Sequence, residues 1–167
     1  MRRKQHIKWF FAAMLLIPLQ PAAQLRTPEK ADSVLQRQSK PVVIFVYTDW
    51  CRYCRLMEET TFKDPDLIAF LHRYFYFLKV NAEEKRPIRF MGRMYYYRPT
   101  GAGTGIHELA AFLLGNKPAG YPALVFLSPG ANLLFRVNTV ITPEDLLRLL
   151  AAIHKTENQS QPLPGNR

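Results

Sequence analysis

Only two cysteines occur in this chain of 167 residues, Cys51 and Cys54, and two residues separate them. A pair at this spacing can be a redox-active disulfide, a structural disulfide or part of a metal site. A structural disulfide here would close a very short loop, which gains little stability from a cross-link. A zinc or copper site would need two more ligands, and no histidine stands at ligand spacing from the pair. We therefore expect neither a metal nor a bound cofactor, and the surrounding elements must show how reactive the cysteines are.

The residues around the pair predict a buried strand followed by a helix. Residues 42–47 form a continuous apolar, largely β-branched run, which is typical of a strand covered on both faces. A helical pattern begins at Cys51, a second helix follows Pro65, and residues 75–80 predict another strand. Strand, helix and strand in this order imply a βαβ unit with parallel strands.

This context favours a reactive thiol at Cys51. Unpaired N–H groups and the macrodipole at a helix start lower the pKa of a thiol, and Arg52 adds positive charge. Cys54 lies three residues further along the same helix face, and we expect it to be more buried. Cys51 would then attack a substrate disulfide, and Cys54 would resolve the mixed disulfide.

The second half of the chain predicts two more strands and a final helix. Residues 88–90 and 94–97 predict a small hairpin with Gly92 in its turn, and residues 98–105 a flexible loop without phosphate-binding spacing. The remaining predicted elements are a helix at 106–114, an antiparallel hairpin of strands 123–127 and 133–137, a helix that Thr142 caps, and a disordered tail at 155–167.

The N-terminus predicts export. Residues 1–23 have the basic, apolar and small-residue order of a signal peptide, cleaved near residue 23, and residues 24–39 form a lead-in to the domain. An uncleaved anchor is the alternative. Without Arg2, Arg3, Lys4 and Lys8 the net charge falls from +10 to +6, and the remaining basic residues are scattered rather than gathered in a stripe, so we expect no nucleic-acid binding. The expected location is the periplasm.

The order of these elements, with Trp50-Cys51-Arg52-Tyr53-Cys54 and a distant Tyr121-Pro122, resembles the thioredoxin-like superfamily over residues 40–154. The segments 40–51 and 61–65 resemble the periplasmic thioredoxin-like domain of transmembrane disulfide reductases. The resemblance implies an α/β fold, with a central mixed sheet flanked by helices and an irregular insertion near residues 86–105. It also implies that Pro122 is a cis-proline beside the cysteines and that Tyr121 offers its backbone to an extended substrate; a trans proline that opens an edge strand is the alternative. We expect Trp50 to pack beside the pair and contact substrate, with an ordinary core aromatic as the alternative.

One position departs from the thioredoxin pattern. Many thioredoxins place a buried acid six residues before the first cysteine, where this chain has Phe45. Glu58, four residues after Cys54 on the same predicted helix, would take over the proton transfer, and the resemblance to the reductase domains supports an acid there. A solvated surface glutamate is the alternative.

Together these features predict an exported thiol–disulfide oxidoreductase that reduces protein or peptide disulfides through Cys51 and Cys54. We expect a monomer that takes its electrons from a membrane or exported donor protein. An oxidase or isomerase of the same fold, and a redox-inert binding module that uses the groove at Tyr121, are the alternatives.

Overall fold

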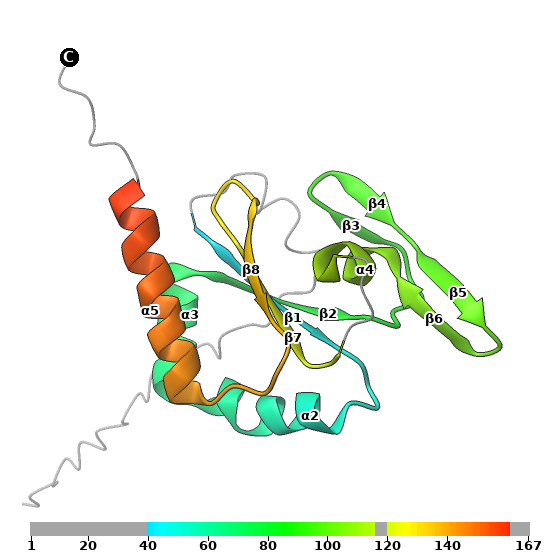
Figure 1. Cartoon of the computed structure of the whole chain (residues 1–167), viewed down its shortest axis with the longest axis horizontal. Helices are drawn as coiled ribbons and strands as arrows, with labels where there is room; N and C mark the ends of the chain where they lie inside the picture. The colour runs from blue at the N-terminus through cyan, green and yellow to red at the C-terminus, as the bar shows by residue number, and fades with distance from the viewer. Residues whose placement is uncertain (1–39, 116–119, 161–167) are drawn as a thin grey trace, which may run out of the picture.

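A four-stranded mixed sheet lies at the centre of the chain, in the strand order β2-β1-β7-β8 (Figure 1). The computed structural model describes residues 40–115 and 120–160. The strands of the sheet are β1 (Val42–Tyr47), β2 (Tyr76–Asn81), β7 (Ala123–Leu127) and β8 (Leu133–Val137). β1 runs parallel to β2 and antiparallel to β7, and β8 returns antiparallel to β7. The parallel βαβ unit, the later hairpin and the mixed sheet predicted from the sequence are therefore confirmed.

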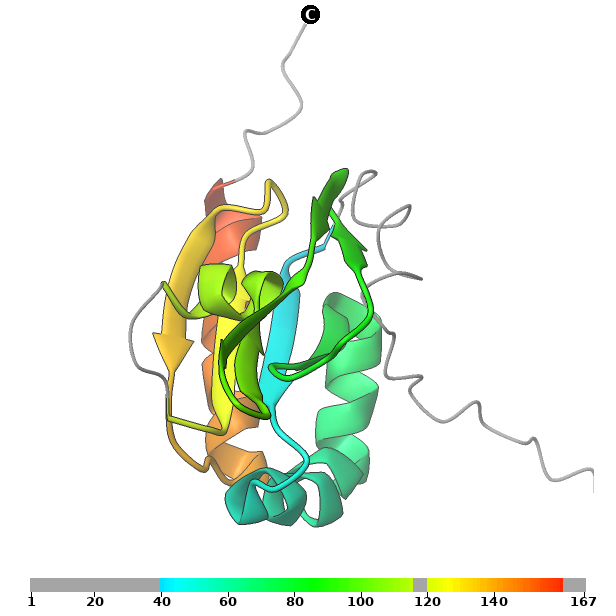
Figure 2. The same cartoon turned by 90° about the vertical axis from the view of Figure 1, so that its right-hand side faces the viewer.

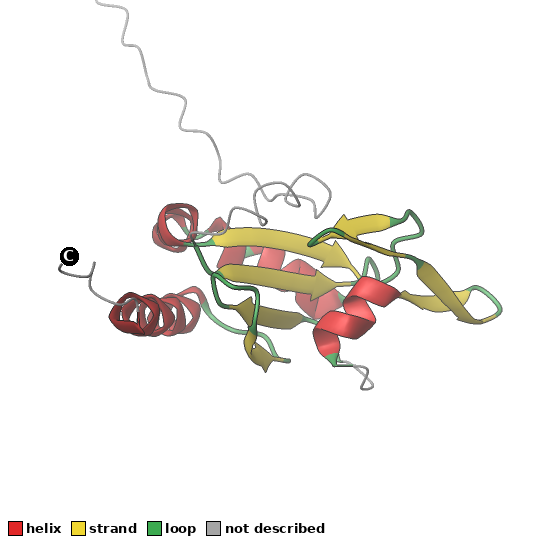
Figure 3. Ribbon diagram, turned by 90° about the horizontal axis from the view of Figure 1, so that it is seen from above, coloured by secondary structure: helices red, strands yellow, loops and turns green. Residues whose placement is uncertain are grey.

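Helices cover both faces of this sheet. They are α2 (Arg52–Glu59), a 3₁₀ turn η1 (Thr61–Lys63), α3 (Pro65–Tyr74), α4 (Glu108–Leu114) and α5 (Pro143–Ser160). Side chains of β1 alternate between two cores: Val43 and Phe45 pack with the side of α2, α3 and α5, while Ile44 and Val46 pack with the side of α4. Seen from above, α4 lies in front of the sheet and α2 behind it (Figure 3). Because both faces of β1 are covered, its sequence is apolar throughout.

The insertion between β2 and α4 consists of two hairpins, which face the viewer in Figure 2. Their strands are β3 (Ile88–Phe90), β4 (Arg93–Tyr95), β5 (Tyr97–Gly101) and β6 (Thr104–His107). The first hairpin is confirmed, with Gly92 at a positive φ of 78° in its turn, but its second strand is Arg93–Tyr95 rather than the predicted 94–97. The flexible loop predicted for residues 98–105 was wrong, because these residues form most of the second hairpin.

The second hairpin contains a close contact at a glycine. The Tyr97 ring crosses over Gly105 so closely that a Cβ there would meet the tyrosine hydroxyl at 2.3 Å. Lys85 places its Nζ 3.3 Å from the centroid of the same ring. The helix predicted from residue 106 begins at Glu108 instead, since His107 still pairs with Tyr97 and its side chain caps α4 by accepting the Leu109 N–H.

The C-terminal helix is longer than the sequence predicts. α5 continues to Ser160, so the disordered tail predicted from residue 155 was wrong for residues 155–160. Bonds one turn apart extend the helix: Thr156 donates to the carbonyl of Ala152, and Asn158 bonds to His154. The predicted signal peptide (1–23), the lead-in (24–39) and the rest of the tail (161–167) lie outside the described residues. Within residues 40–115 and 120–160, no helix combines the length and apolar character needed to cross a membrane.

Candidate active site

Cys51 and Cys54 form a disulfide at the start of α2, with an S–S distance of 2.05 Å. Cys51 is the N-cap of the helix, and its Sγ accepts the backbone N–H of Cys54 at 3.0 Å. The turn from β1 is closed by the Cys51 N–H, which donates to the Thr48 carbonyl at 3.2 Å. Cys51 is 6% exposed and Cys54 1% exposed, which confirms that the second cysteine is the more buried.

This geometry favours a thiolate at Cys51 once the disulfide is reduced. The Cys51 sulfur lies where a helix offers unpaired N–H groups and the positive end of its macrodipole, and both stabilise an anion. The first turn of α2 contains no acid, and Arg52 follows Cys51 directly. Cys54 packs in the core beside Met57, where burial favours the neutral thiol. The environment of Cys51 thus suits a nucleophile, and that of Cys54 suits a thiol that reacts second.

Trp50 and Tyr121 meet beside the disulfide although they are distant in the sequence. Their ring centroids lie 6.0 Å apart in an edge-on arrangement, and Trp50 is 66% exposed. The peptide bond between Tyr121 and Pro122 is cis, as predicted. Pro122 precedes β7, whose first residue Ala123 pairs with Val46 near the end of β1. The cis-proline is therefore held near the end of the strand that leads to Cys51, and its role in binding substrate stays a prediction.

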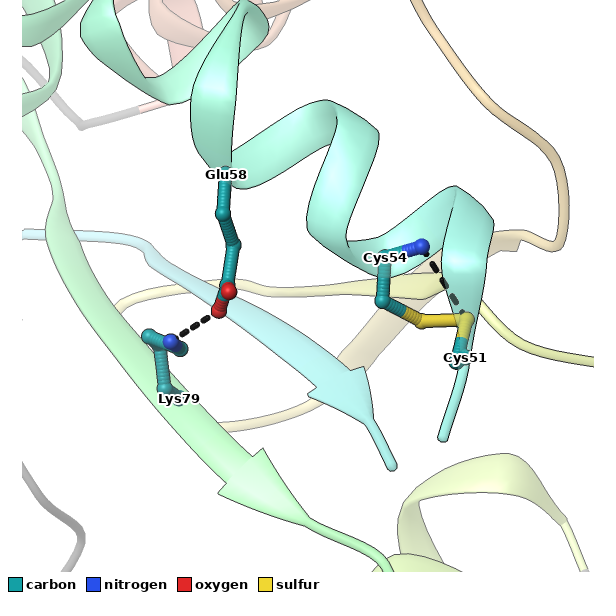
Figure 4. The surroundings of a disulfide bond; sticks show 4 residues. All are labelled: Cys51, Cys54, Glu58 and Lys79. Atoms are coloured by element: carbon teal, nitrogen blue, oxygen red, sulfur yellow. Dashed lines mark hydrogen bonds and ion pairs between the residues drawn. A yellow bond between two sulfur atoms is a disulfide. The ribbon is translucent and has the colours of Figure 1, made fainter. Parts of the chain in front are cut away.

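Position 45 on β1 holds a phenylalanine, and the nearby acid Glu58 lies on α2. Phe45 is fully buried, and its partner across the parallel ladder is Lys79 of β2. The ammonium group of Lys79 forms an ion pair with the Glu58 carboxylate and lies 4.5 Å from the centroid of the Tyr47 ring. Figure 4 shows the Glu58 side chain directed at Lys79, one turn of helix away from Cys54.

Glu58 makes no hydrogen bond to either cysteine within the described residues. Its role in proton transfer therefore stays a prediction. Burial raises the pKa of Tyr47 above its ordinary value, and the negative charges of Asp49, Glu58 and Glu84 add to this effect. Tyr47 thus stays a neutral phenol beside the pair formed by Glu58 and Lys79.

Two residues near the disulfide were missed in the sequence. Glu83 accepts a hydrogen bond from the Trp50 indole at 3.0 Å, and its charge is the second cause, after burial, of a raised pKa at Tyr121. Lys79 carries the only charge in β2 and so interrupts an otherwise uncharged strand. That interruption was the available signal for Lys79, because a half-buried lysine in a strand needs a partner. Glu83 stands in a charged loop, and no pattern there distinguishes it from its neighbours.

The described residues contain no cluster of three or more histidine, cysteine or acidic side chains that could hold a metal ion. The disulfide between Cys51 and Cys54 allows thiol–disulfide exchange, in which a thiolate attacks a disulfide sulfur and a second thiol then displaces it. Cys54, buried three residues further along, can act as that second thiol within the same chain. The class of protein so defined is a thiol–disulfide oxidoreductase.

Comparison with known proteins identifies the family. Residues 28–154 match the family model described as a thioredoxin-like domain, and the chain belongs to this family. Among solved structures, a thioredoxin from Thermus thermophilus is similar at 22% identity and a TM-score of 0.55, covering 80% of this chain and 89% of its own. A structure titled DsbH oxidoreductase is similar at 18% identity and a TM-score of 0.52, covering 86% of this chain and 92% of its own. A disulphide isomerase from Xylella fastidiosa Temecula1 is similar at 16% identity and a TM-score of 0.50, covering 74% of this chain and 86% of its own. These similarities show the shared fold. A comparison with curated protein sequences gave no match.

Proposed function

We propose that the protein acts after export, in the periplasm, and reduces disulfide bonds of polypeptides there. The observation that carries this proposal is the position of Cys51, whose sulfur caps α2 and accepts the Cys54 N–H. Such a thiol is ionised more readily than a free cysteine, and the thiolate is the nucleophile in disulfide exchange. The basic and apolar N-terminal residues support export.

The reaction would proceed in two exchanges. The Cys51 thiolate attacks one sulfur of the substrate disulfide, so that a bond from Cys51 to the substrate forms and the substrate bond breaks. The released substrate thiolate takes a proton. Cys54 then loses its proton and attacks Cys51, which restores the internal disulfide and releases the second substrate thiol. Two electrons pass from the protein to the substrate, and a membrane or exported donor protein must supply them again.

Glu58 would accept the Cys54 proton in the second exchange. Cys54 is nearly completely buried, so its proton needs an acceptor within the protein or a water molecule that the protein positions. The Glu58 carboxylate lies on the same helix, and Lys79 holds it on the side of α2 that faces the sheet. Trp50 and Tyr121 would contact the substrate chain beside the sulfur under attack.

Reduction of insulin is the first test. The pre-reduced protein should precipitate the insulin B chain in the presence of dithiothreitol, and Cys51→Ser should abolish this catalysis. Cys54→Ala should retain the first exchange and accumulate a mixed disulfide with the substrate, detectable by non-reducing electrophoresis. Equal rates for the wild type and Cys51→Ser would refute catalysis and favour a binding module.

The direction of electron flow needs a separate measurement, because the two residues between the cysteines do not fix the reduction potential. Equilibration with reduced and oxidised glutathione gives that potential. A value below about −230 mV is expected for a reductase, since thioredoxin itself lies near −270 mV and a strong oxidant such as DsbA near −120 mV. A value near that of the strong oxidants would contradict reduction and assign the protein to disulfide formation.

A further inference from the structure

The exposed side of α2 beside the disulfide is both cationic and apolar. Every third residue of this segment, Cys51, Cys54 and Met57, is buried. Arg52 and Arg55 lie between them and are exposed, as are Tyr53 at 65% and Leu56 at 46%. We refer to these four residues, Arg52, Tyr53, Arg55 and Leu56, as the α2 surface.

The charges of the α2 surface are unfavourable in the free protein. The N-terminus of a helix is its positive end and stabilises anions, yet the first turn of α2 carries a cation and no acid. Arg52 and Arg55 stand three residues apart, where like charges on a helix repel each other. No ion pair within residues 40–115 and 120–160 joins either arginine to an acid, including Glu59 one turn after Arg55.

Two acids close to Trp50, Asp49 and Glu83, already accept hydrogen bonds from other residues. Asp49 accepts a hydrogen bond from the Asn81 side chain at 3.0 Å, and Glu83 accepts one from Trp50 at 3.0 Å. Arg86 in turn forms an ion pair with the neighbouring Glu84. Arg52 and Arg55 on the first half of α2 therefore have no acid partner among these residues, and an acidic group of a substrate could supply one.

We propose that the α2 surface binds an acidic and apolar segment of the substrate polypeptide next to the disulfide that is reduced. The occupant is an extended chain in which a carboxylate side chain and an aliphatic side chain lie close to one cysteine. The carboxylate offsets the charges of Arg52 and Arg55, and the aliphatic group covers Tyr53 and Leu56. This inference rests on the proposed function and names the class of substrate.

Matched peptides test the preference. Three disulfide-linked peptide dimers are made, identical except that the residues flanking a Leu-Cys core are aspartate, glutamine or lysine. The full-length protein is reduced, freed of reductant and mixed with each dimer, and acid-quenched samples are separated by chromatography. The second-order rate constant of each dimer is divided by its rate constant with dithiothreitol, which removes the effect of the flanking charge on the peptide's own sulfur.

The wild type is expected to reduce the aspartate dimer about five- to tenfold faster than the lysine dimer at low salt, because opposite charges steer the encounter. The ratio should fall towards one in 1 M salt, where charges are screened within about 3 Å. Arg55→Glu should bring the ratio close to one, because its charge cancels that of Arg52, and Arg55→Gln should reduce the ratio less. Arg73→Glu changes the same charge on α3, in an exposed position remote from the disulfide, and should leave the ratio unchanged.

The outcomes separate the two proposals. If the wild type reduces the glutamine dimer no faster than Cys51→Ser does, the proposed function is wrong. If it reduces the glutamine dimer but shows no preference for aspartate over lysine, or if Arg55→Glu keeps the preference of the wild type, the substrate-binding role of the α2 surface is wrong and the catalytic function stands.

The Arg55 variants should retain the fold, because the Arg55 side chain is exposed and makes no hydrogen bond or ion pair in the described contacts. Circular dichroism of both variants checks this.

Discussion

The indole nitrogen of Trp50 donates a hydrogen bond to Oε1 of Glu83 at 3.0 Å, although the two residues are 33 positions apart. Two further bonds join the same segments: the Ala82 N–H donates to the Tyr47 carbonyl at 2.8 Å, and Asn81 donates to Asp49 at 3.0 Å. The turn that precedes Cys51 is therefore attached to the loop that leads into the two hairpins. The position of Trp50, next to Cys51 in the sequence, is therefore supported by that loop.

Glu83→Leu should weaken substrate binding while leaving the chemical step intact. The substitution removes the acceptor for the Trp50 indole, so the ring loses its fixed orientation above Tyr121. We expect the KM for a peptide disulfide to rise about three- to tenfold, with kcat nearly unchanged, as for the loss of one partly exposed hydrogen bond. Glu83→Gln is the matched control, since its amide oxygen still accepts the bond. The indole N–H resonance of Trp50 should shift in the leucine variant only, and equal KM values for both variants would refute a positioning role.

Glu58→Gln should slow disulfide exchange without unfolding the protein. If the carboxylate accepts the proton of Cys54, its loss should lower the rate of the second exchange about a hundredfold at pH 7, at the lower end of the range for general base catalysis. The difference should narrow at higher pH, where Cys54 ionises without help. Stopped-flow measurement of the decay of a mixed disulfide across pH 6–10 gives the profile. Glu59→Gln, an exposed neighbour, serves as control and should match the wild type. An unchanged profile in Glu58→Gln would eliminate this carboxylate as the base.

Lys79→Met tests whether the ion pair keeps the Glu58 carboxylate in position. Lys79 contacts both the Glu58 carboxylate and the Tyr47 ring, and its side chain is 23% exposed. We expect Lys79→Met to slow the second exchange, and the double variant with Glu58→Gln to be no slower than Glu58→Gln alone, because both changes act on one unit. Fully additive effects on the rate would show that the two residues act independently.

Much of the fold follows from local patterns in the sequence. The apolar run before Cys51 predicts β1, and the pattern of Asp64 before Pro65 predicts the start of α3, where Asp64 accepts the Leu67 N–H at 2.8 Å. The second hairpin could not be predicted in this way. In this hairpin Tyr97 crosses Gly105 and Lys85 lies over the same ring, contacts that no local periodicity encodes.

Some residues of the candidate site could likewise be predicted from the sequence, and others could not. Cys51, Cys54 and the cis-proline at Pro122 follow from a short motif and a family resemblance. The positions of Glu83 and Lys79 depend on which strands are neighbours and in which register. Lys79 can pair with Glu58 of α2 because it lies opposite Phe45 in the parallel ladder, a register that only the tertiary structure provides.

The stabilisation that Glu84 gains from Arg86 should be lost in acid. Its side-chain hydrogen bonds with Arg86, followed by the Arg86 backbone N–H, hold the pKa of Glu84 at about 2, against an ordinary value of 4.5. A folded-state pKa below the unfolded one means that the stabilisation is fully present above pH 4.5 and is lost as the pH falls towards 2. The pair is largely exposed, so we expect less than about 1 kcal/mol. The free energy of unfolding of the wild type should exceed that of Glu84→Gln at pH 7 and approach it at pH 3. A gap that widens in acid would contradict the assignment, and Glu59→Gln serves as the control.

Gly105→Ala should destabilise the second hairpin, whereas Gly120→Ala should not. A Cβ at position 105 would lie 2.3 Å from the Tyr97 hydroxyl and 2.5 Å from the Arg98 carbonyl, and the backbone oxygen cannot move away without breaking the register of β5 and β6. Nothing lies within 4 Å of the corresponding position at Gly120, and its φ is not positive. We expect Gly105→Ala to lower the free energy of unfolding in urea by about 1–3 kcal/mol, as overpacking does, and to speed amide exchange in residues 97–107. Equal stability of the two variants would show that Tyr97 and the strand adjust at little cost, and that the glycine is not what selects a hairpin here.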